Sequence, residues 1–162
     1  MIDTKEYDKT LPRKRLGAGA LFTNTEDKIL VVAPTYKSEW EIPGGTVEES
    51  ESPKNACLRE VKEELGVDLP IGGLLALNYR EESESVSELL LFLFDGGVLT
   101  DKQIGNVKLP PDELSEFRFL TLDEIKDKVL PSLYELIKSG LLQRKLNHSQ
   151  YTENSRTVDE LG

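Results

Sequence analysis

The sequence predicts a single α/β (α+β) domain, and three stretches of the chain carry this prediction. Residues 53–65 have the periodicity of an amphipathic helix, and residues 131–146 repeat that periodicity. Residues 89–94 read LLLFLF, and such a continuous apolar run is typical of a strand buried on both faces. Short strand-like runs lie between these stretches, so the chain is predicted to fold as one unit of strands and helices.

The remaining elements follow from strand and turn signals. Residues 1–15 are expected to form a polar lead-in, for which one extra strand is an open alternative. From residue 147 the chain has little to bury, so 147–162 is expected to be a flexible tail, and the domain itself is placed at 16–146. Strands are predicted at 18–22, 28–32, 39–42, 73–80, 88–94 and 116–120, with a brief helix from residue 121.

Composition and charge restrict the partners of such a domain. With 38% hydrophobic and 31% charged residues, the chain is typical of a soluble globular protein, and no apolar run approaches the ~20 residues of a membrane span. A net charge of −10 disfavours nucleic acid and anionic membranes, whose binding requires Lys and Arg. The start of the chain lacks an apolar secretory signal and Cys57 is the lone cysteine, so a cytoplasmic location is expected.

The most informative segment is the helix predicted at residues 53–65, because it carries three glutamates on one side. Glu60, Glu63 and Glu64 stand at positions i, i+3 and i+4, which confines them to an arc of roughly 100°. Like charges this close repel each other unless a cation lies among them, and Mg²⁺ or Mn²⁺ suits carboxylate oxygens. Arg59 precedes Glu63 by one turn and is expected to hold its carboxylate by a charge-assisted hydrogen bond.

The neighbouring residues predict a rigid support for these glutamates. Ser52 is a favourable N-cap, Pro53 is a favourable first helical residue, and Gly66 is placed to end the helix in a left-handed conformation. A solvent-exposed acidic face is the plain alternative, but it does not explain the glycine turn before the helix. The apolar stripe that should enter the core comprises Leu58, Val61 and Leu65.

Residues 45–67, GTVEESESPKNACLREVKEELGV, carry a resemblance to a known family. The segment resembles the signature of the Nudix (MutT-like) hydrolases, G-x5-E-x7-R-E-U-x-E-E-x-G-U, where U is a bulky aliphatic residue. The resemblance implies an α-β-α sandwich with a mixed β-sheet between helices, and a nucleotide pyrophosphohydrolase. The matching positions are Gly45, Glu51, Arg59, Glu60, Val61, Glu63, Glu64, Gly66 and Val67.

The predicted metal site combines these glutamates with the glycine turn. Glu60 and Glu64 are expected to bind Mg²⁺, with Mn²⁺ as an alternative, and Glu63 is a further candidate ligand. The resemblance implies that the carbonyl of Gly44 adds another oxygen. A metal ion there would neutralise phosphates and glutamates together and lower the pKa of a bound water. In this way so acidic a chain could still bind a nucleotide.

Two candidates are open for the general base that activates this water. Glu63, oriented by Arg59, is the candidate within the helix. The resemblance implies an alternative on a later loop, where Glu113 is the best candidate, with Asp112 and Glu116 behind it. A base must lie within hydrogen-bond reach of the water, and spacing along the chain does not decide which acid does so.

Four residues near the first strand and the glycine turn are candidates for substrate contacts. Trp40 could stack on a nucleobase, although packing against the core or its rim is favoured for it. Tyr36 and Lys37 are expected on a loop that overhangs the cleft, and Arg15 could reach a substrate phosphate.

Together these features predict Mg²⁺-dependent hydrolysis of a P–O–P bond in a nucleoside diphosphate linked to a moiety X. The products would be a nucleoside monophosphate and a phosphorylated product. A nucleotide-sensing regulatory module on the same fold is the alternative, but such modules typically lose glutamates that are all present here. The moiety X stays open, because Glu82 and Glu84 stand where selective subfamilies carry proline and tyrosine. A homodimer is expected only by family resemblance, and neither a nucleic acid duplex nor a membrane is an expected partner.

Overall fold

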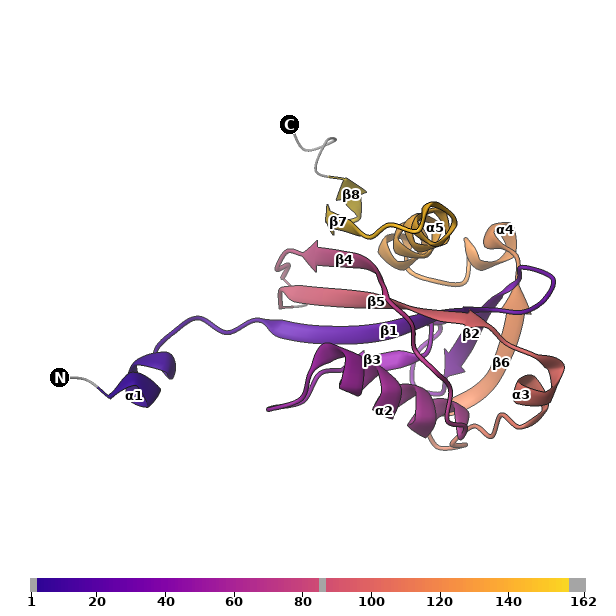
Figure 1. The fold of residues 1–162 in the computed structure, drawn as a ribbon, viewed down its shortest axis with the longest axis horizontal. Helices are drawn as coiled ribbons and strands as arrows, with labels where there is room; N and C mark the ends of the chain where they lie inside the picture. The colour runs from indigo at the N-terminus through magenta and orange to yellow at the C-terminus, as the bar shows by residue number, and fades with distance from the viewer. Residues whose placement is uncertain (1–2, 85–86, 158–162) are drawn as a thin grey trace.

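The structure is a computed structural model that describes residues 3–84 and 87–157. Its elements are α1 (Thr4–Asp8), β1 (Arg15–Thr23), β2 (Ile29–Pro34), β3 (Gly44–Thr46), α2 (Pro53–Leu65), β4 (Leu74–Arg80), β5 (Leu89–Val98), α3 (Asp101–Gly105), β6 (Leu114–Leu120), α4 (Leu122–Ile125), α5 (Pro131–Leu146), β7 (Gln150–Glu153) and β8 (Arg156–Thr157). Within these residues, eight strands form one mixed sheet in the order β6-β2-β1-β5-β4-β7-β8, with β3 paired to β1. Helix α2 covers one face and helix α5 the other, which confirms the α-β-α sandwich (Figure 1). No helix in the described part of the chain has the length and apolar character needed to cross a membrane.

Strand β1 occupies the centre of the sheet. It runs parallel to β5 and antiparallel to β2 and β3, and β4 continues the sheet antiparallel to β5. The register aligns Arg15 of β1 with Leu89 of β5, and Leu89 in turn with Arg80 of β4. Residues two apart on a strand share a face, so the next aligned set on this face is Gly17, Leu91 and Asn78.

The sheet separates two hydrophobic cores. Successive side chains on a strand point to opposite faces, so Leu21 and Phe22 enter different cores. Phe22 packs in the cluster to which helix α2 contributes Val61 and Leu65. Leu21 packs in the cluster to which helix α5 contributes Ile137. Each helix is therefore held on the sheet by a core of its own.

Helix α2 begins and ends where the sequence predicts. The Ser52 hydroxyl accepts a hydrogen bond from the backbone N–H of Asn55 at 3.2 Å, and Gly66 follows the helix with a φ of 67°. The predicted apolar stripe needs one correction, because Leu58 is 37% exposed. The buried face is instead centred on Cys57, Val61 and Leu65, which are spaced four residues apart. Leu58 follows Cys57 by one residue, so its side chain lies about 100° further around the helix. The buried residues of α2 are Ala56, Cys57, Val61 and Leu65.

Two N-terminal predictions differ from the structure. Residues 39–42 do not form a strand; they contribute only isolated bridges, and the paired strand is β3, which lies against β1. The lead-in forms the short helix α1 in place of the extra strand, with Asp3 as N-cap. None of the residues of α1 is buried, and the helix stands away from the sheet (Figure 1). Residues 1–2 of the lead-in lie outside the described residues.

The C-terminal segment adds to the sheet where a flexible tail was predicted. Strand β7 runs parallel to β4, and β8 pairs with β7. The buried Thr152 hydroxyl donates to Oδ1 of Asn78 at 2.8 Å, and Ser155 donates both to Asn78 and to the carbonyl of Ser132. The prediction is therefore corrected for β7 and β8, because these polar groups satisfy one another as they become buried. Residues 158–162 of the predicted tail lie outside the described residues.

Strand β5 is buried on both faces only in its central part. Leu93 and Phe94 are buried, as the continuous apolar run predicts. Leu89 and Leu91 are partly exposed, because they line an open cleft. The apolar run therefore serves both the core and the cleft.

Candidate functional site

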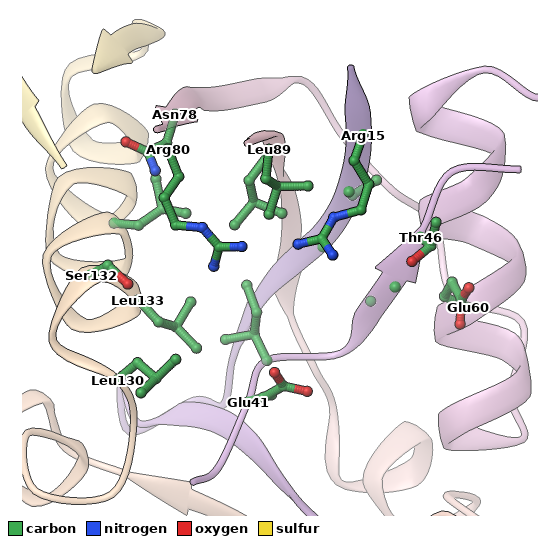
Figure 2. A pocket seen from close by; sticks show the side chains of 18 of the residues that line it. Arg15, Glu41, Thr46, Glu60, Asn78, Arg80, Leu89, Leu130, Ser132 and Leu133 are labelled. Atoms are coloured by element: carbon green, nitrogen blue, oxygen red, sulfur yellow. The ribbon is translucent and has the colours of Figure 1, made fainter. Parts of the chain in front are cut away.

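A cleft of about 600 Å³ opens on the face of the sheet that also carries α5 (Figure 2). Strands β1 and β5 line it, and Gly17 and Gly19 of β1 leave room because they have no side chains. Glu60 of α2 lies on one side of the cleft and Glu41 at its lower edge, and Arg15 of β1 and Arg80 of β4 lie between Glu60 and α5 (Figure 2). The cleft therefore has an acidic and a basic part.

The glycine turn brings the backbone into direct contact with the carboxylates of α2. The N–H of Gly44 donates a hydrogen bond to Oε2 of Glu64 at 2.8 Å. Gly44 has a φ of +152°, and a Cβ there would lie 2.3 Å from the carbonyl oxygen of Ala18. A Cβ at Gly45 would lie 2.4 Å from the carboxyl carbon of Glu60. The two glycines therefore let β3 approach both β1 and the acidic face of α2.

Glu64 lies in surroundings that disfavour its negative charge. Burial raises the pKa of its carboxyl group to about 8, and the hydrogen bond from Gly44 opposes this shift. The charges of Glu60, Glu41 and Glu113 raise the pKa further. A divalent cation would offset this unfavourable concentration of negative charge. The side chains at this end of the cleft therefore fit a bound Mg²⁺ or Mn²⁺.

Arg59 links the loop before α2 to the glutamates of the helix. Its Nε and Nη2 atoms donate to the two carboxylate oxygens of Glu51, each at 2.9 Å. Its Nη1 atom donates to Glu60 at 2.8 Å and to Glu63 at 3.2 Å, and Nη2 also donates to the carbonyl of Thr46. The hydrogen bonds to Glu51 are the main reason that the pKa of Arg59 is raised. The predicted contact with Glu63 is present, but Arg59 is held chiefly by Glu51.

The structure brings two of the three predicted metal glutamates to the cleft. Glu60 and Glu64 line it together with Gly44. The side chain of Glu63 is 56% exposed, is directed to Arg59 and does not line the cleft. In the part of the chain that is described, no three acidic, His or Cys side chains form a ready metal cage. An ion would therefore depend on Glu60 and Glu64 together with backbone, water or substrate oxygens.

Of the three candidate acids in the region predicted as a later loop, the structure brings one to the cleft; Asp112 and Glu113 precede β6, and Glu116 lies within it. Glu113 lines the cleft, and its charge acts on Glu64. Asp112 and Glu116 do not line it, and Glu116 pairs with Arg118 on the same strand. Glu113 is therefore the loop acid that a bound substrate could meet.

The loop between β2 and β3 forms part of the rim of the cleft. Lys37 lines the cleft and forms an ion pair with Glu41, an acidic lining residue that the sequence analysis did not single out. Tyr36 also lines the rim and is 74% exposed, with the ammonium group of Lys37 5.6 Å from its ring centroid. Both predicted contact residues of this loop thus face the cleft.

Trp40 lies outside the residues that line the cleft. It packs against the core on the α5 face. Arg118 and Lys128 lie 5.4 and 5.6 Å from its ring, at distances typical of cation–π contacts. The structure therefore separates Trp40 from the other three predicted substrate contacts.

Several polar residues that line the cleft were not predicted from the sequence. Arg15 was predicted and lines the cleft, but Asn78, Arg80 and Ser132 line it as well (Figure 2). The signal for Asn78 and Arg80 is their alternation in an otherwise largely apolar strand, which places both on one face of β4. Ser132 gives no such signal, because its position depends on how α5 packs on the sheet.

Comparison with known families agrees with the fold and with the acidic helix. The NUDIX domain profile matches residues 13–139. The chain therefore belongs to the NUDIX family, as the resemblance of residues 45–67 predicts.

Curated relatives match one part of the chain. Diphosphoinositol polyphosphate phosphohydrolase 2 of Rattus norvegicus is 39% identical over 75 residues, which cover 46% of this chain and 42% of the relative. The protein of the same name from Homo sapiens is 37% identical over 75 residues, with the same coverage. The matched segment thus spans less than half the length of either relative.

Solved structures agree with the fold over more of the chain. The MutT protein of Methanosarcina mazei Go1 is 23% identical, with a TM-score of 0.69 over 84% of this chain and 99% of that one. A UDP-X diphosphatase is 19% identical, with a TM-score of 0.68 over 94% of this chain and 76% of that one. At this level of identity the similarity supports the fold alone.

Proposed function

We propose that this protein hydrolyses a P–O–P bond in a nucleoside diphosphate linked to a moiety X, in the presence of Mg²⁺ or Mn²⁺. A nucleoside monophosphate and a phosphorylated product would be released. The observation that carries the proposal is the buried carboxyl group of Glu64, held by Gly44 and surrounded by further acids in the cleft. Membership of the NUDIX family supports it, as do curated relatives named phosphohydrolase.

Glu60, Glu64 and the carbonyl of Gly44 are the proposed metal ligands. When bound, the ion would neutralise phosphate charge and lower the pKa of a water molecule. Arg59 acts as a positioning residue, because it holds Glu60 on one side and is itself fixed by Glu51 on the other. The three donors lie within one short segment of helix and one turn, so they need little rearrangement to act together.

Glu113 is the acid that we favour as general base. It lines the cleft, whereas Glu63 is engaged by Arg59 and lies outside the lining. Lys37 and Tyr36 at the rim are proposed contacts for the substrate, with Arg15 on the floor. Trp40 remains a weaker candidate for this role. The cytoplasmic location and the homodimer stay predictions.

The second candidate function is a nucleotide-sensing module that binds without significant turnover. A panel of nucleoside diphosphate derivatives, assayed for product release with Mg²⁺, with Mn²⁺ and with EDTA, separates the two candidates. The proposal expects turnover that requires the metal ion and that falls by about a hundredfold or more in Glu64→Gln and in Glu113→Gln. The exposed Glu49→Gln variant is the matched control and should keep the parent rate. Binding without hydrolysis by the parent protein would favour the sensing module and reject the enzyme.

A further inference from the structure

Arg15 and Arg80 lie on the same face of the sheet with one strand between them. The register places both opposite Leu89, so the order across the sheet is Arg80, Leu89 and Arg15. Neighbouring strands are about 4.8 Å apart, which puts the two arginine Cα atoms roughly 10 Å from each other. Both guanidinium groups extend into the same cleft, one on either side of Leu89 (Figure 2). The long side chains can therefore converge on one small group between them.

The described part of the chain offers neither arginine a carboxylate partner. Every recorded ion pair of an arginine there involves other arginines: Arg59, Arg118 and Arg144. The Nε–H group of Arg80 is buried and donates no hydrogen bond within these residues. Burial, and then the charge of Arg15, lower the pKa of Arg80. Two guanidinium groups that face each other without an acid are unfavourable unless an anion joins them.

The arginines are separate from the proposed metal site. From β4 toward α2, the cleft presents Arg80, Arg15, Thr46 and then Glu60 (Figure 2). This order follows the chain of contacts from β4 through β5 and β1 to β3, and from β3 to α2. A pyrophosphate bound through metal ions would lie at the glutamates. The arginines are then available to another part of the same molecule.

We propose that Arg15 and Arg80 bind a second anionic group of the substrate, a phosphate that is separate from the P–O–P bond to be cleaved. This inference rests on the proposed function and narrows it: the preferred substrate carries a pyrophosphate and at least one additional phosphate. Guanidinium groups match phosphate oxygens by bidentate, charge-assisted hydrogen bonds, and the buried Nε of Arg80 would gain a partner. Asn78, aligned one rung further on the same face, can add a neutral donor.

The leucines of the cleft restrict what surrounds this phosphate. Leu89 lies on the floor, and Leu130 and Leu133 come from the start of α5 (Figure 2). Leu91 also lines the cleft. These side chains lower the local dielectric, which strengthens hydrogen bonds from the arginines to an anion. They also disfavour a second charged group beside the first. The site is therefore suited to one phosphate on an otherwise less polar scaffold.

The test compares pairs of P–O–P compounds that differ by one phosphate, namely NADPH with NADH and coenzyme A with dephospho-coenzyme A. In at least one pair, the parent protein should hydrolyse the compound with the additional phosphate with a kcat/KM about ten- to a hundredfold higher. Arg15→Gln and Arg80→Gln should each remove most of this preference, because they should lower kcat/KM for the compound with the additional phosphate far more than for the other compound. The exposed Arg156→Gln makes the same change of charge outside the cleft and should retain the preference.

Two results would overturn the inference. One is a parent protein that shows no preference in either pair. The other is an equal loss for both members of a pair in Arg15→Gln and Arg80→Gln, since the arginines would then act on the pyrophosphate that is cleaved. If a Gln variant fails to fold, Arg15→Lys and Arg80→Lys keep the charge and lose the bidentate geometry, and the same ratio is measured with them.

A binding measurement separates failure of this inference from failure of the proposed function. Calorimetry in EDTA compares AMP with adenosine 2′,5′-bisphosphate, neither of which has a P–O–P bond. The bisphosphate should bind the parent protein at least tenfold more tightly than AMP, and this difference should disappear in Arg15→Gln and Arg80→Gln. Equal binding of the two ligands by the parent would reject the phosphate site even if hydrolysis of other compounds is found. Preferred binding without any hydrolysis would retain the site and reject the enzyme.

Discussion

The backbone N–H of Gly44 and the carboxyl group of Glu64 are joined by a 2.8 Å hydrogen bond across 20 positions of the chain. This contact fixes the glycine turn against α2 and holds an acid where burial raises its pKa to about 8. The arrangement is unfavourable for the metal-free protein and favourable for binding a cation. Stability and proposed activity therefore oppose each other at this residue.

The pH dependence of stability should reveal this cost when EDTA removes metal ions. The unfolded chain loses the Glu64 proton near the ordinary value of 4.5, whereas the folded protein keeps it until about 8. The free energy of unfolding should therefore fall as the pH rises through this range. Urea unfolding at several pH values measures the slope. Glu64→Gln should have a smaller slope than the parent, and Glu49→Gln should match the parent; indistinguishable slopes in all three would contradict the assignment.

A methyl group at Gly45 should disturb the site without disturbing the rest of the fold. Gly45→Ala places a Cβ 2.4 Å from the carboxyl carbon of Glu60, so the carboxylate must move. Displacement of about 1 Å at a catalytic group can reduce the rate on the order of a hundredfold, so kcat/KM should fall by about ten- to a hundredfold. Gly73→Ala is the control, because a Cβ there meets nothing within 4 Å. Equal rates for the two variants would show that Glu60 is not held by the turn.

Replacement of Arg59 by lysine tests the role of its planar guanidinium group. Lysine keeps the charge but cannot hold both oxygens of Glu51 while it also reaches Glu60. We expect Arg59→Lys to lower kcat by roughly tenfold or more with a smaller change in KM, because a positioning residue acts on the geometry of the site. Steady-state kinetics provide both constants. A change confined to KM would instead assign Arg59 to substrate binding.

Cys57 should be unreactive until the protein unfolds. Burial raises the pKa of its thiol to about 12, and the charges of Glu64 and Glu60 add to the shift. Thiolate is the reactive form, so a thiol reagent at pH 8 should label the native protein far more slowly than the same protein in urea. Mass spectrometry measures the labelled fraction. Rapid and complete labelling of the native protein would mean that α2 opens readily.

The hydrogen bond between Thr152 and Asn78 should contribute to stability. Thr152 is 2% exposed and Asn78 is 4% exposed. Thr152→Val leaves the side-chain oxygen of Asn78 with one donor fewer in a buried place, which should cost about 1–3 kcal/mol in the free energy of unfolding. The exposed Thr25→Val variant is the control, with an expected change below about 0.5 kcal/mol. A negligible change in Thr152→Val would indicate that β7 separates easily from β4.

Local signals in the sequence predicted those parts of the fold that depend on neighbours in the chain. The Ser52 cap and the Gly66 end of α2 are fixed within one helical turn of their partners, and both were found. Strand β7 was missed because its burial depends on the pairing of Thr152 with Asn78, 74 positions away. No local pattern marks such a contact, because a short polar segment at this place in the sequence has the composition of a flexible tail.

The same distinction applies to the site. Helical spacing places Glu60, Glu63 and Glu64 within one arc, but it does not say how the helix is rotated on the sheet. In the structure, the rotation of α2 on the sheet directs Glu63 away from the cleft, and the same rotation leaves Leu58 exposed. Alternation along β4 marks Arg80, but its place beside Arg15 follows only from the registers of β4 and β1 with β5.

The hairpin of β7 and β8 forms hydrogen bonds to two residues that line the cleft. Thr152 and Ser155 both donate to Asn78, and Ser155 also donates to the carbonyl of Ser132. The hairpin of β7 and β8 thus supports one wall of the cleft. Shortening it, or attaching a fusion partner that pulls on it, would shift that wall while the acidic helix stays in place. Changes in this hairpin alone are therefore expected to alter ligand preference between close homologues.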